Sequence, residues 1–88
     1  MRKKRVDSNH AELRDYMRKL GAIVKDTSKF GEGFPDVMVK FCGVIFFIEI
    51  KKDEKAKLTK AEQEFKEFIG KKYNVVCSKE DINKLFGV

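Results

Sequence analysis

Two short apolar runs, residues 36–41 and 44–51, lie on either side of the pair Cys42-Gly43. Both runs are rich in β-branched and aromatic residues, which favour β-strands. A glycine-containing pair between two such runs is typical of a tight hairpin turn. The pattern therefore predicts a β-hairpin with Cys42 and Gly43 as its loop, and the other elements of the chain are interpreted around it.

The register of this hairpin gathers charged groups at one of its ends. With the two-residue loop, Asp36 lies directly opposite Glu49, and Phe34 lies opposite Lys51. Side chains alternate between the two faces of a strand, so Glu49 and Lys51 point to the same face. We therefore expect two carboxylates and one ammonium group close together on one face of the sheet.

The two faces of the hairpin differ in composition. One face is wholly apolar and is the expected core face, whereas the face that carries Asp36 mixes apolar and charged residues. The second face is therefore not an ordinary solvated surface. The expected core face consists of Val37, Val39, Phe41, Val44, Phe46 and Ile48, and the apolar neighbours of Asp36 are Met38, Ile45 and Phe47.

Two carboxylates placed opposite each other suggest a metal site. At about 5 Å between Cβ atoms, Asp36 and Glu49 repel each other unless a cation compensates. Mg²⁺ is a natural compensating ion because it prefers hard oxygen ligands. Lys51 could then orient a water molecule or stabilise charge that develops on a phosphate. The arrangement indicates metal-assisted hydrolysis of a phosphodiester.

Helix-start signals occur outside the hairpin at Asn9-x-x-Glu12, Thr59-x-x-Glu62 and Ser78-x-x-Asp81. They predict a chain order of α-β-β-β-α-β-α in one α/β domain. In order, we expect a helix from Ser8 or Asn9 to Leu20, a strand at 22–26, the hairpin, a helix from Thr59 to Gly70, a strand at 73–78 and a short final helix. The second helix should turn one face inward: Leu58, Ala61, Phe65 and Phe68.

Length and hydropathy limit the class of protein. The 88 residues are enough for one domain with a modest core. No run approaches the roughly 18 apolar residues of a membrane span. No apolar stretch follows the basic N-terminus, as it would in a signal peptide. We therefore expect a cytoplasmic protein without a membrane partner.

The charge balance favours a polyanionic partner. Twenty Lys and Arg residues face 14 acidic ones, which gives a net charge of +6. The alternative is that the lysines serve solubility alone. We divide the chain into a flexible basic arm, residues 1–7, and a folded domain, residues 8–88. The expected nucleic-acid contacts are Arg2, Lys3, Lys4 and Arg5 of the arm and Lys52, Lys55 and Lys57 of the loop after the hairpin; a disordered arm and a solvated loop are the alternatives.

Cysteine and histidine are too scarce for a zinc site. The chain has two isolated cysteines, Cys42 and Cys77, and one histidine, His10. Cys77 is expected to pack as a small apolar residue. His10 precedes the body of the first helix and is expected to be exposed rather than catalytic.

Pro35-Asp36 followed by Glu49-Ile50-Lys51 resembles the motif of the PD-(D/E)XK nuclease superfamily, in particular the stand-alone VRR-NUC type of bacteria and phages. The resemblance extends over most of the chain, from about Asn9 to Ser78. The strings that carry it are Gly33-Phe34-Pro35-Asp36, Phe46-Phe47-Ile48-Glu49-Ile50-Lys51, Leu58-Thr59 and Tyr73-Asn74-Val75-Val76-Cys77. It implies a restriction-endonuclease-like domain with a central mixed sheet flanked by helices.

The resemblance also implies a site. Asp36 and Glu49 would bind Mg²⁺ or Mn²⁺, and the carbonyl of Ile50 would add a ligand. Lys51 would position or help to activate the attacking water. Glu12, on the first helix, matches the acidic residue that completes such sites. Small stand-alone members resemble homodimeric Holliday-junction resolvases in a bacterial or phage-infected cell.

One position departs from the family pattern. The family usually has glutamine four residues after the leucine that precedes the second helix, where this chain has Glu62 and then Gln63. Either the start of the helix is shifted, or Glu62 fills the role.

We therefore interpret the chain as a metal-dependent DNA endonuclease that acts on branched DNA, with a four-way junction as the best candidate. Resolving a junction symmetrically requires two active sites, and a two-fold dimer supplies them. Two alternatives remain: a basic DNA-binding module of the same fold without activity, and a nuclease of ordinary duplex. Each site residue also has a simpler interpretation: Asp36 as a turn residue, Glu49 and Lys51 as a surface pair on an edge strand, and Glu12 as a capping-box acid.

Overall fold

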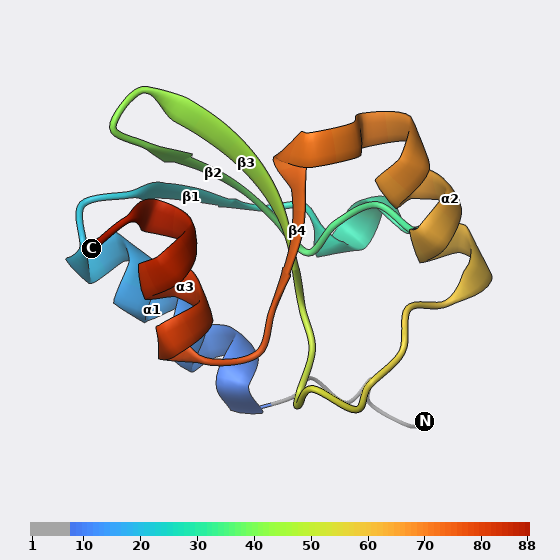
Figure 1. Ribbon diagram of the computed structural model, residues 1–88, viewed down its shortest axis with the longest axis horizontal. Helices are drawn as coiled ribbons and strands as arrows, with labels where there is room; N and C mark the ends of the chain where they lie inside the picture. The colour runs from blue at the N-terminus through green and yellow to red at the C-terminus, as the bar shows by residue number, and fades with distance from the viewer. Residues whose placement is uncertain (1–7) are drawn as a thin grey trace.

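The computed structural model describes residues 8–88 and has the predicted order of elements (Figure 1). The basic arm with Arg2, Lys3, Lys4 and Arg5 lies outside the described residues. The helices are α1 (Ser8–Lys19), α2 (Lys60–Ile69) and α3 (Lys79–Phe86), and the strands are β1 (Ile23–Asp26), β2 (Val37–Phe41), β3 (Val44–Ile50) and β4 (Tyr73–Val76). Two short 3₁₀ turns, Ser28–Phe30 and Gly70–Lys72, precede the hairpin and β4.

The four strands form one mixed sheet in the order β1-β2-β3-β4. β1, β2 and β3 are antiparallel neighbours, whereas β4 returns parallel to β3 after the crossover through α2. This mixed sheet with flanking helices confirms the predicted fold class. It also places the C-terminal end of β3 beside β4, away from the hairpin loop.

The predicted hairpin register is confirmed from the loop to the far end of β2. Phe41 pairs with Val44 next to the loop, and Val37 pairs with Ile48 at the other end. Cys42 and Gly43 both have positive φ, 50° and 81°, as a two-residue turn that matches the twist of the strands requires. The local turn chemistry therefore sets which residues face each other at the distant end.

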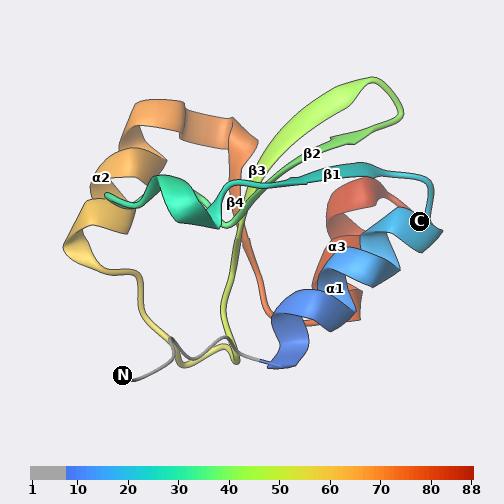
Figure 2. The ribbon, with the colours of Figure 1, turned by 180° about the vertical axis from the view of Figure 1, so that it is seen from behind.

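Helices cover the two faces of the sheet unequally. α1 and α3 lie side by side on one face, and α2 lies on the other side with the segment that precedes β2 (Figures 1 and 2). The main core lies between the sheet and the α1–α3 pair, and its buried members are Leu13, Met17, Ala22, Val24, Val37, Val39, Ile48, Ile50, Val76 and Ile82. Three residues of the expected core face, Val37, Val39 and Ile48, are fully buried.

Side chains on the core face of the hairpin become less buried toward the loop. Phe41 stacks on Phe86 of α3 with ring centroids 4.2 Å apart, and Phe46 lies 5.6 Å from the same ring. Val44, which was expected in the core, is 41% exposed. The alternation of side chains predicted its face correctly, but α3 ends with Phe86, and Val44 next to the loop is left partly exposed.

The prediction that α2 packs Phe68 inward is wrong. Phe68 is 84% exposed and lies at the outer end of a row of aromatic rings. In this row, which we call the aromatic row, Phe30, Phe34, Phe65 and Phe68 follow one another at centroid distances of 4.8, 4.8 and 5.9 Å. Phe30, at its other end, is 66% exposed. The row leaves an apolar surface at both ends.

Gly33 fixes how closely α2 approaches the start of β2. Its φ of +81° already disfavours other residues, and a Cβ atom there would lie 2.3 Å from the carbonyl oxygen of Ala61. The backbone of the first turn of α2 therefore rests directly on the chain just before Pro35 and Asp36. This contact positions the N-terminal end of α2 over the charged end of the hairpin.

No helix between residues 8 and 88 is long and apolar enough to cross a lipid bilayer.

Candidate active site

The charged group predicted at the end of the hairpin is present. Val37 and Ile48 are the last pair of the β2–β3 ladder, and Asp36 and Glu49 are the next residue on each strand. The carboxylate of Asp36 reaches across and accepts a hydrogen bond from the backbone N–H of Ile50, with Oδ2 2.8 Å from the nitrogen. This bond fixes the Asp36 carboxylate at the end of β3.

Glu49 is buried without full compensation of its polar atoms. The residue is only 4% exposed, and its Oε1 has no hydrogen-bond partner among the described residues. Its Oε2 lies 3.6 Å from Nζ of Lys51. Burial first, and then the charges of Asp36 and Glu62, raise the pKa of Glu49 to about 9. The folded protein therefore holds a proton here at neutral pH, unless a cation takes its place.

Lys51 forms its shortest ion pair with Glu62 of α2, at 2.9 Å between Nζ and Oε1. Burial lowers the pKa of Lys51, but the hydrogen bond to Glu62 and the charge of Glu49 outweigh that effect and the net shift is upward. Burial likewise raises the pKa of Glu62, yet hydrogen bonds from Lys51 and the backbone of Thr59 make the net shift downward. Lys51 and Glu62 are therefore a charged pair at neutral pH.

Glu62 stands where the family usually has glutamine, and the structure shows that the start of α2 is not shifted. Thr59 caps α2 in the predicted capping box: its hydroxyl accepts from the N–H of Glu62, and its own N–H donates to Oε1 of Glu62. The start of the helix is therefore where the sequence placed it. Gln63 is exposed and donates to the carbonyl of Leu58 instead. Glu62 is the residue of this pair that contacts Lys51.

Two residues at the start of α1 hold the end of β3, and sequence reasoning missed both in this role. Nδ2 of Asn9 donates to the carbonyl of Lys51 at 2.8 Å. Nε2 of His10 lies 3.1 Å from the carbonyl oxygen of Ile50 and 3.8 Å from Oδ2 of Asp36. The side chain of His10 is 15% exposed, so the expectation that it is exposed was wrong. The helix begins at Ser8, so Asn9 lies within it and is not a cap.

Tyr73, the first residue of β4, extends this group from the other side. Its hydroxyl is buried and has no hydrogen-bond partner among the described residues. Burial, and then the charges of Glu49, Glu62 and Asp36, raise its pKa, so the hydroxyl stays protonated and lies near the carboxylates. Tyr73 belongs to a string that matched the family pattern, but nothing local marked its hydroxyl as part of a site.

Comparison with known structures identifies the family. A solved structure described as a "VRR_NUC domain" superposes on this chain with a TM-score of 0.68 and 32% sequence identity, over 89% of each chain. The chain belongs to the VRR_NUC family. This homology supports a nuclease domain, and the nuclease fold suggests the use of a divalent metal. No family model matches the sequence, and no curated protein matches it.

In this chain, Glu12 does not reach the candidate site. The side chain of Glu12 is 62% exposed, and its carboxylate lies 3.6 Å from Nζ of Lys79 at the start of α3. His10, two residues earlier, is the residue of this helix that faces Asp36. Residues two positions apart on a helix point about 200° apart, so both cannot face the same site. The role that the resemblance implied for Glu12 has no geometric support here.

We expect Glu12→Ala to leave the affinity for Mn²⁺ unchanged and to lower stability by less than about 1 kcal/mol, because its ion pair with Lys79 is exposed. Loss of even a neighbour that orients a metal ligand typically costs about 10–100-fold in affinity. Isothermal titration of Mn²⁺ into the wild type and Glu12→Ala distinguishes the two cases. A tenfold weaker titration would place Glu12 at the metal after all.

The donor set suits an ion that takes few protein ligands. Within residues 8–88, no three His, Cys, Asp or Glu side chains form a group that could hold a metal ion. Mg²⁺ is typically held by one or two carboxylates, with water and substrate phosphate as its remaining ligands. Asp36 and Glu49 meet that requirement, and the unpartnered Oε1 of Glu49 is a free ligand atom. The carbonyl of Ile50 is already within hydrogen-bond distance of His10.

The loop lysines predicted to bind DNA lie in the segment of the chain that joins β3 to α2. Lys52, Lys55 and Lys57 are all exposed in this irregular segment. Asp53 organises this segment by accepting from the backbone N–H groups of Lys55 and Ala56. The three ammonium groups therefore belong to a loop that begins directly after Lys51.

Proposed function

We propose that this VRR_NUC domain is a metal-dependent endodeoxyribonuclease that hydrolyses DNA phosphodiester bonds. The observation that carries the proposal is the buried carboxylate of Glu49, which has an unpartnered oxygen and lies beside Asp36 and Lys51. A buried carboxylate pair is costly for the folded protein unless a cation binds there. A nuclease gains from this arrangement, and a module that only binds DNA does not.

Each residue of the site has a distinct role in this proposal. Asp36 and Glu49 would hold Mg²⁺ or Mn²⁺, which supplies Lewis-acid polarisation of the phosphate and a nucleophile at neutral pH. Lys51 stays protonated because its pKa is raised, so it acts as a fixed positive charge for the phosphate and not as a base. Glu62 holds the ammonium group in place from the side. Asn9 and His10 bind the carbonyls at the end of β3 and so restrain the strand that carries Glu49.

The test is cleavage of an end-labelled four-way junction beside a linear duplex of the same arms, with Mg²⁺, Mn²⁺ or chelator. We expect paired cuts in the junction, lost in chelator. Cutting of both substrates would keep the nuclease and remove the junction preference. Binding to both without cutting in either metal would favour the alternative of an inactive DNA-binding module.

We also propose that the enzyme acts as a homodimer through the aromatic row. Phe68 and Phe30 expose rings at its two ends, and exposed apolar patches on small domains commonly mark interaction sites. A two-fold dimer presents two active sites to a symmetric junction. The basic arm, residues 1–7, and the loop lysines Lys52, Lys55 and Lys57 would add phosphate contacts without reading sequence.

We expect Phe68→Ser to weaken dimerisation about tenfold or more, since a buried aromatic anchor typically contributes over 1 kcal/mol. Sedimentation velocity over a concentration series measures the change. Val88→Ser is the matched control, because Val88 is 63% exposed and has no part in the aromatic row. A wild type that stays monomeric at the highest concentration, or equal weakening by both substitutions, would refute this interface.

A further inference from the structure

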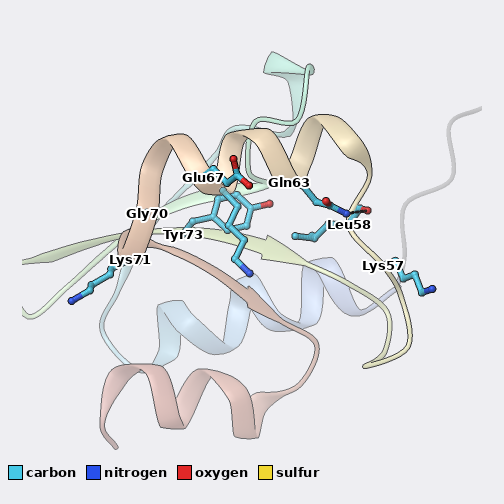
Figure 3. Close-up of a pocket in the computed structure, with 8 residues that line it drawn as sticks. Lys57, Leu58, Gln63, Glu67, Gly70, Lys71 and Tyr73 are labelled. Atoms are coloured by element: carbon cyan, nitrogen blue, oxygen red, sulfur yellow. Dashed lines mark hydrogen bonds between the residues drawn. The ribbon is translucent and has the colours of Figure 1, made fainter.

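An open groove of about 820 Å³ lies beside α2, on the side that faces β4 (Figure 3). Lys57 and Lys71 lie toward its opposite ends, and Tyr73 lies between them. The eight residues that line the groove are Lys57, Leu58, Gln63, Lys66, Glu67, Gly70, Lys71 and Tyr73. They combine three cationic side chains, an apolar floor and two groups that can hydrogen-bond.

This groove lies next to the candidate active site, and Tyr73 borders both. The ring of Tyr73 forms part of the groove wall, while its hydroxyl is buried near Glu49 and Glu62. On α2, Glu62 faces Lys51, and its neighbour Gln63 faces the groove. A strand whose phosphate lies at Lys51 would therefore reach the groove within its next nucleotides.

The charge of the groove fits a polyanion. Three lysines face a single acid, Glu67, and in the described part of the chain none of the three takes part in a side-chain ion pair. The ammonium groups of Lys57, Lys66 and Lys71 would contact the phosphates of a strand that lies along the groove. Between them, Leu58 and the alkyl stems of the lysines offer apolar contact to a base, and Gln63 and Glu67 can hydrogen-bond its edge. Tyr73, only 4% exposed, closes the bottom of the groove.

We propose that the groove binds unpaired nucleotides of the cleaved strand, next to the scissile phosphate. The volume is in the range of small-ligand pockets, about 300–1,000 Å³, which holds a nucleotide or two but no duplex. In a duplex the bases are stacked inside and cannot reach an apolar floor, whereas single strands expose them to side chains. The inference rests on the proposed nuclease function and refines its branched substrate: a branch point whose strands part beside the cut, so that unpaired nucleotides enter the groove.

The test is binding without catalysis. Fluorescence anisotropy in chelator compares a labelled short oligothymidylate with a labelled hairpin duplex, for the wild type and for Lys66→Ala/Lys71→Ala. The matched control is Lys19→Ala/Lys84→Ala, which removes the same charge from exposed positions on α1 and α3, on the other face of the sheet. All four lysines are exposed, so both double variants should fold as the wild type does.

We expect the groove variant to bind the single strand roughly tenfold more weakly at low salt. The slope of log K against log[salt] should fall by about 1.4, which is about 0.7 for each of two lost phosphate contacts. The control should change little, and duplex binding should fall less than single-strand binding. Equal losses in both variants, or an equal loss for duplex and single strand, would overturn the proposal.

The same experiment separates this inference from the proposed function. Because no metal is present, a selective loss in the groove variant supports the groove even if the protein never cuts DNA. Conversely, metal-dependent cutting together with equal losses in both variants would leave the nuclease and remove the groove. Cleavage of a duplex carrying a short single-stranded gap beside the cut gives the second readout: the groove variant should lose the preference for the gap.

Discussion

Replacing Lys51 by methionine should lower the rate of DNA cleavage by about 10²–10³-fold and leave DNA affinity nearly unchanged. The pKa of Lys51 is raised by its partners, so the residue carries a positive charge at every pH where the enzyme would work. It lies between Glu62, at 2.9 Å, and Glu49, at 3.6 Å. Because the protein has many other lysines, the loss of one charge should change DNA affinity little. The cleavage rate should fall because Lys51 is the cation held beside the buried carboxylates. Single-turnover cleavage measures the first quantity and anisotropy the second.

The single substitution also leaves Glu62 without its partner in a partly buried site, which costs the folded state several kcal/mol in such cases. The double variant Lys51→Met/Glu62→Gln removes both members of the pair and should fold better than Lys51→Met. Lys51→Arg keeps the charge in a wider group and should retain part of the activity. If the double variant is folded and cleaves at the rate of the wild type, Lys51 has no catalytic role.

The hairpin and its charged end were predictable because their causes are local. Cys42 and Gly43 favour a two-residue turn, and that loop length alone determines that Val37 faces Ile48 five pairs away. The positions of Asp36 and Glu49 follow from the same count. The capping box at Thr59 and Glu62 was equally local, and it gave the start of α2 correctly.

The rest of the site depends on packing between elements distant in sequence. Asn9 and His10 reach the end of β3 only because α1 crosses the sheet at that point, 40 or more residues away in the chain. A capping spacing suggested a different role for Asn9, and the family resemblance implied a place at the site for Glu12. Nothing in the local sequence distinguishes the face of α1 that meets Asp36 from the face that meets Lys79.

Helical spacing predicts a face but not the extent of the neighbour that covers it. Phe65 and Phe68 are three residues apart and were expected to pack alike. Phe65 meets Phe34 on the chain before β2, while Phe68 lies beyond it and is left exposed. Val44 is exposed for the same reason at the hairpin loop. Both errors fall at the end of an element, where the neighbouring element that should cover the side chain does not extend far enough.

Replacing Glu49 by glutamine should stabilise the metal-free protein, and the gain should grow with pH. The pKa of Glu49 is raised to about 9 in the folded state, against 4.5 as its ordinary value. Between these two values the folded state binds a proton that the unfolded state lacks, so the stability of the wild type falls as pH rises through this window. The fall is at most about 1.4 kcal/mol per pH unit for one proton. Glutamine does not titrate and avoids this loss.

Thermal unfolding in chelator at pH 6, 7 and 8 would measure the difference between the two proteins. In a domain of this size, about 1 kcal/mol corresponds to roughly 4–8 °C in Tm, so the advantage of Glu49→Gln should widen by up to roughly 10–20 °C between pH 6 and pH 8. Glu62, Asp26 and Asp81, whose pKa values are lowered, are ionised throughout this range and cancel in the comparison. A pH-independent difference would mean that Glu49 is not the buried proton carrier. With Mn²⁺ in place of chelator, we expect the wild type to be more stable than Glu49→Gln. A cation that binds Glu49 stabilises only the protein that still has the carboxylate.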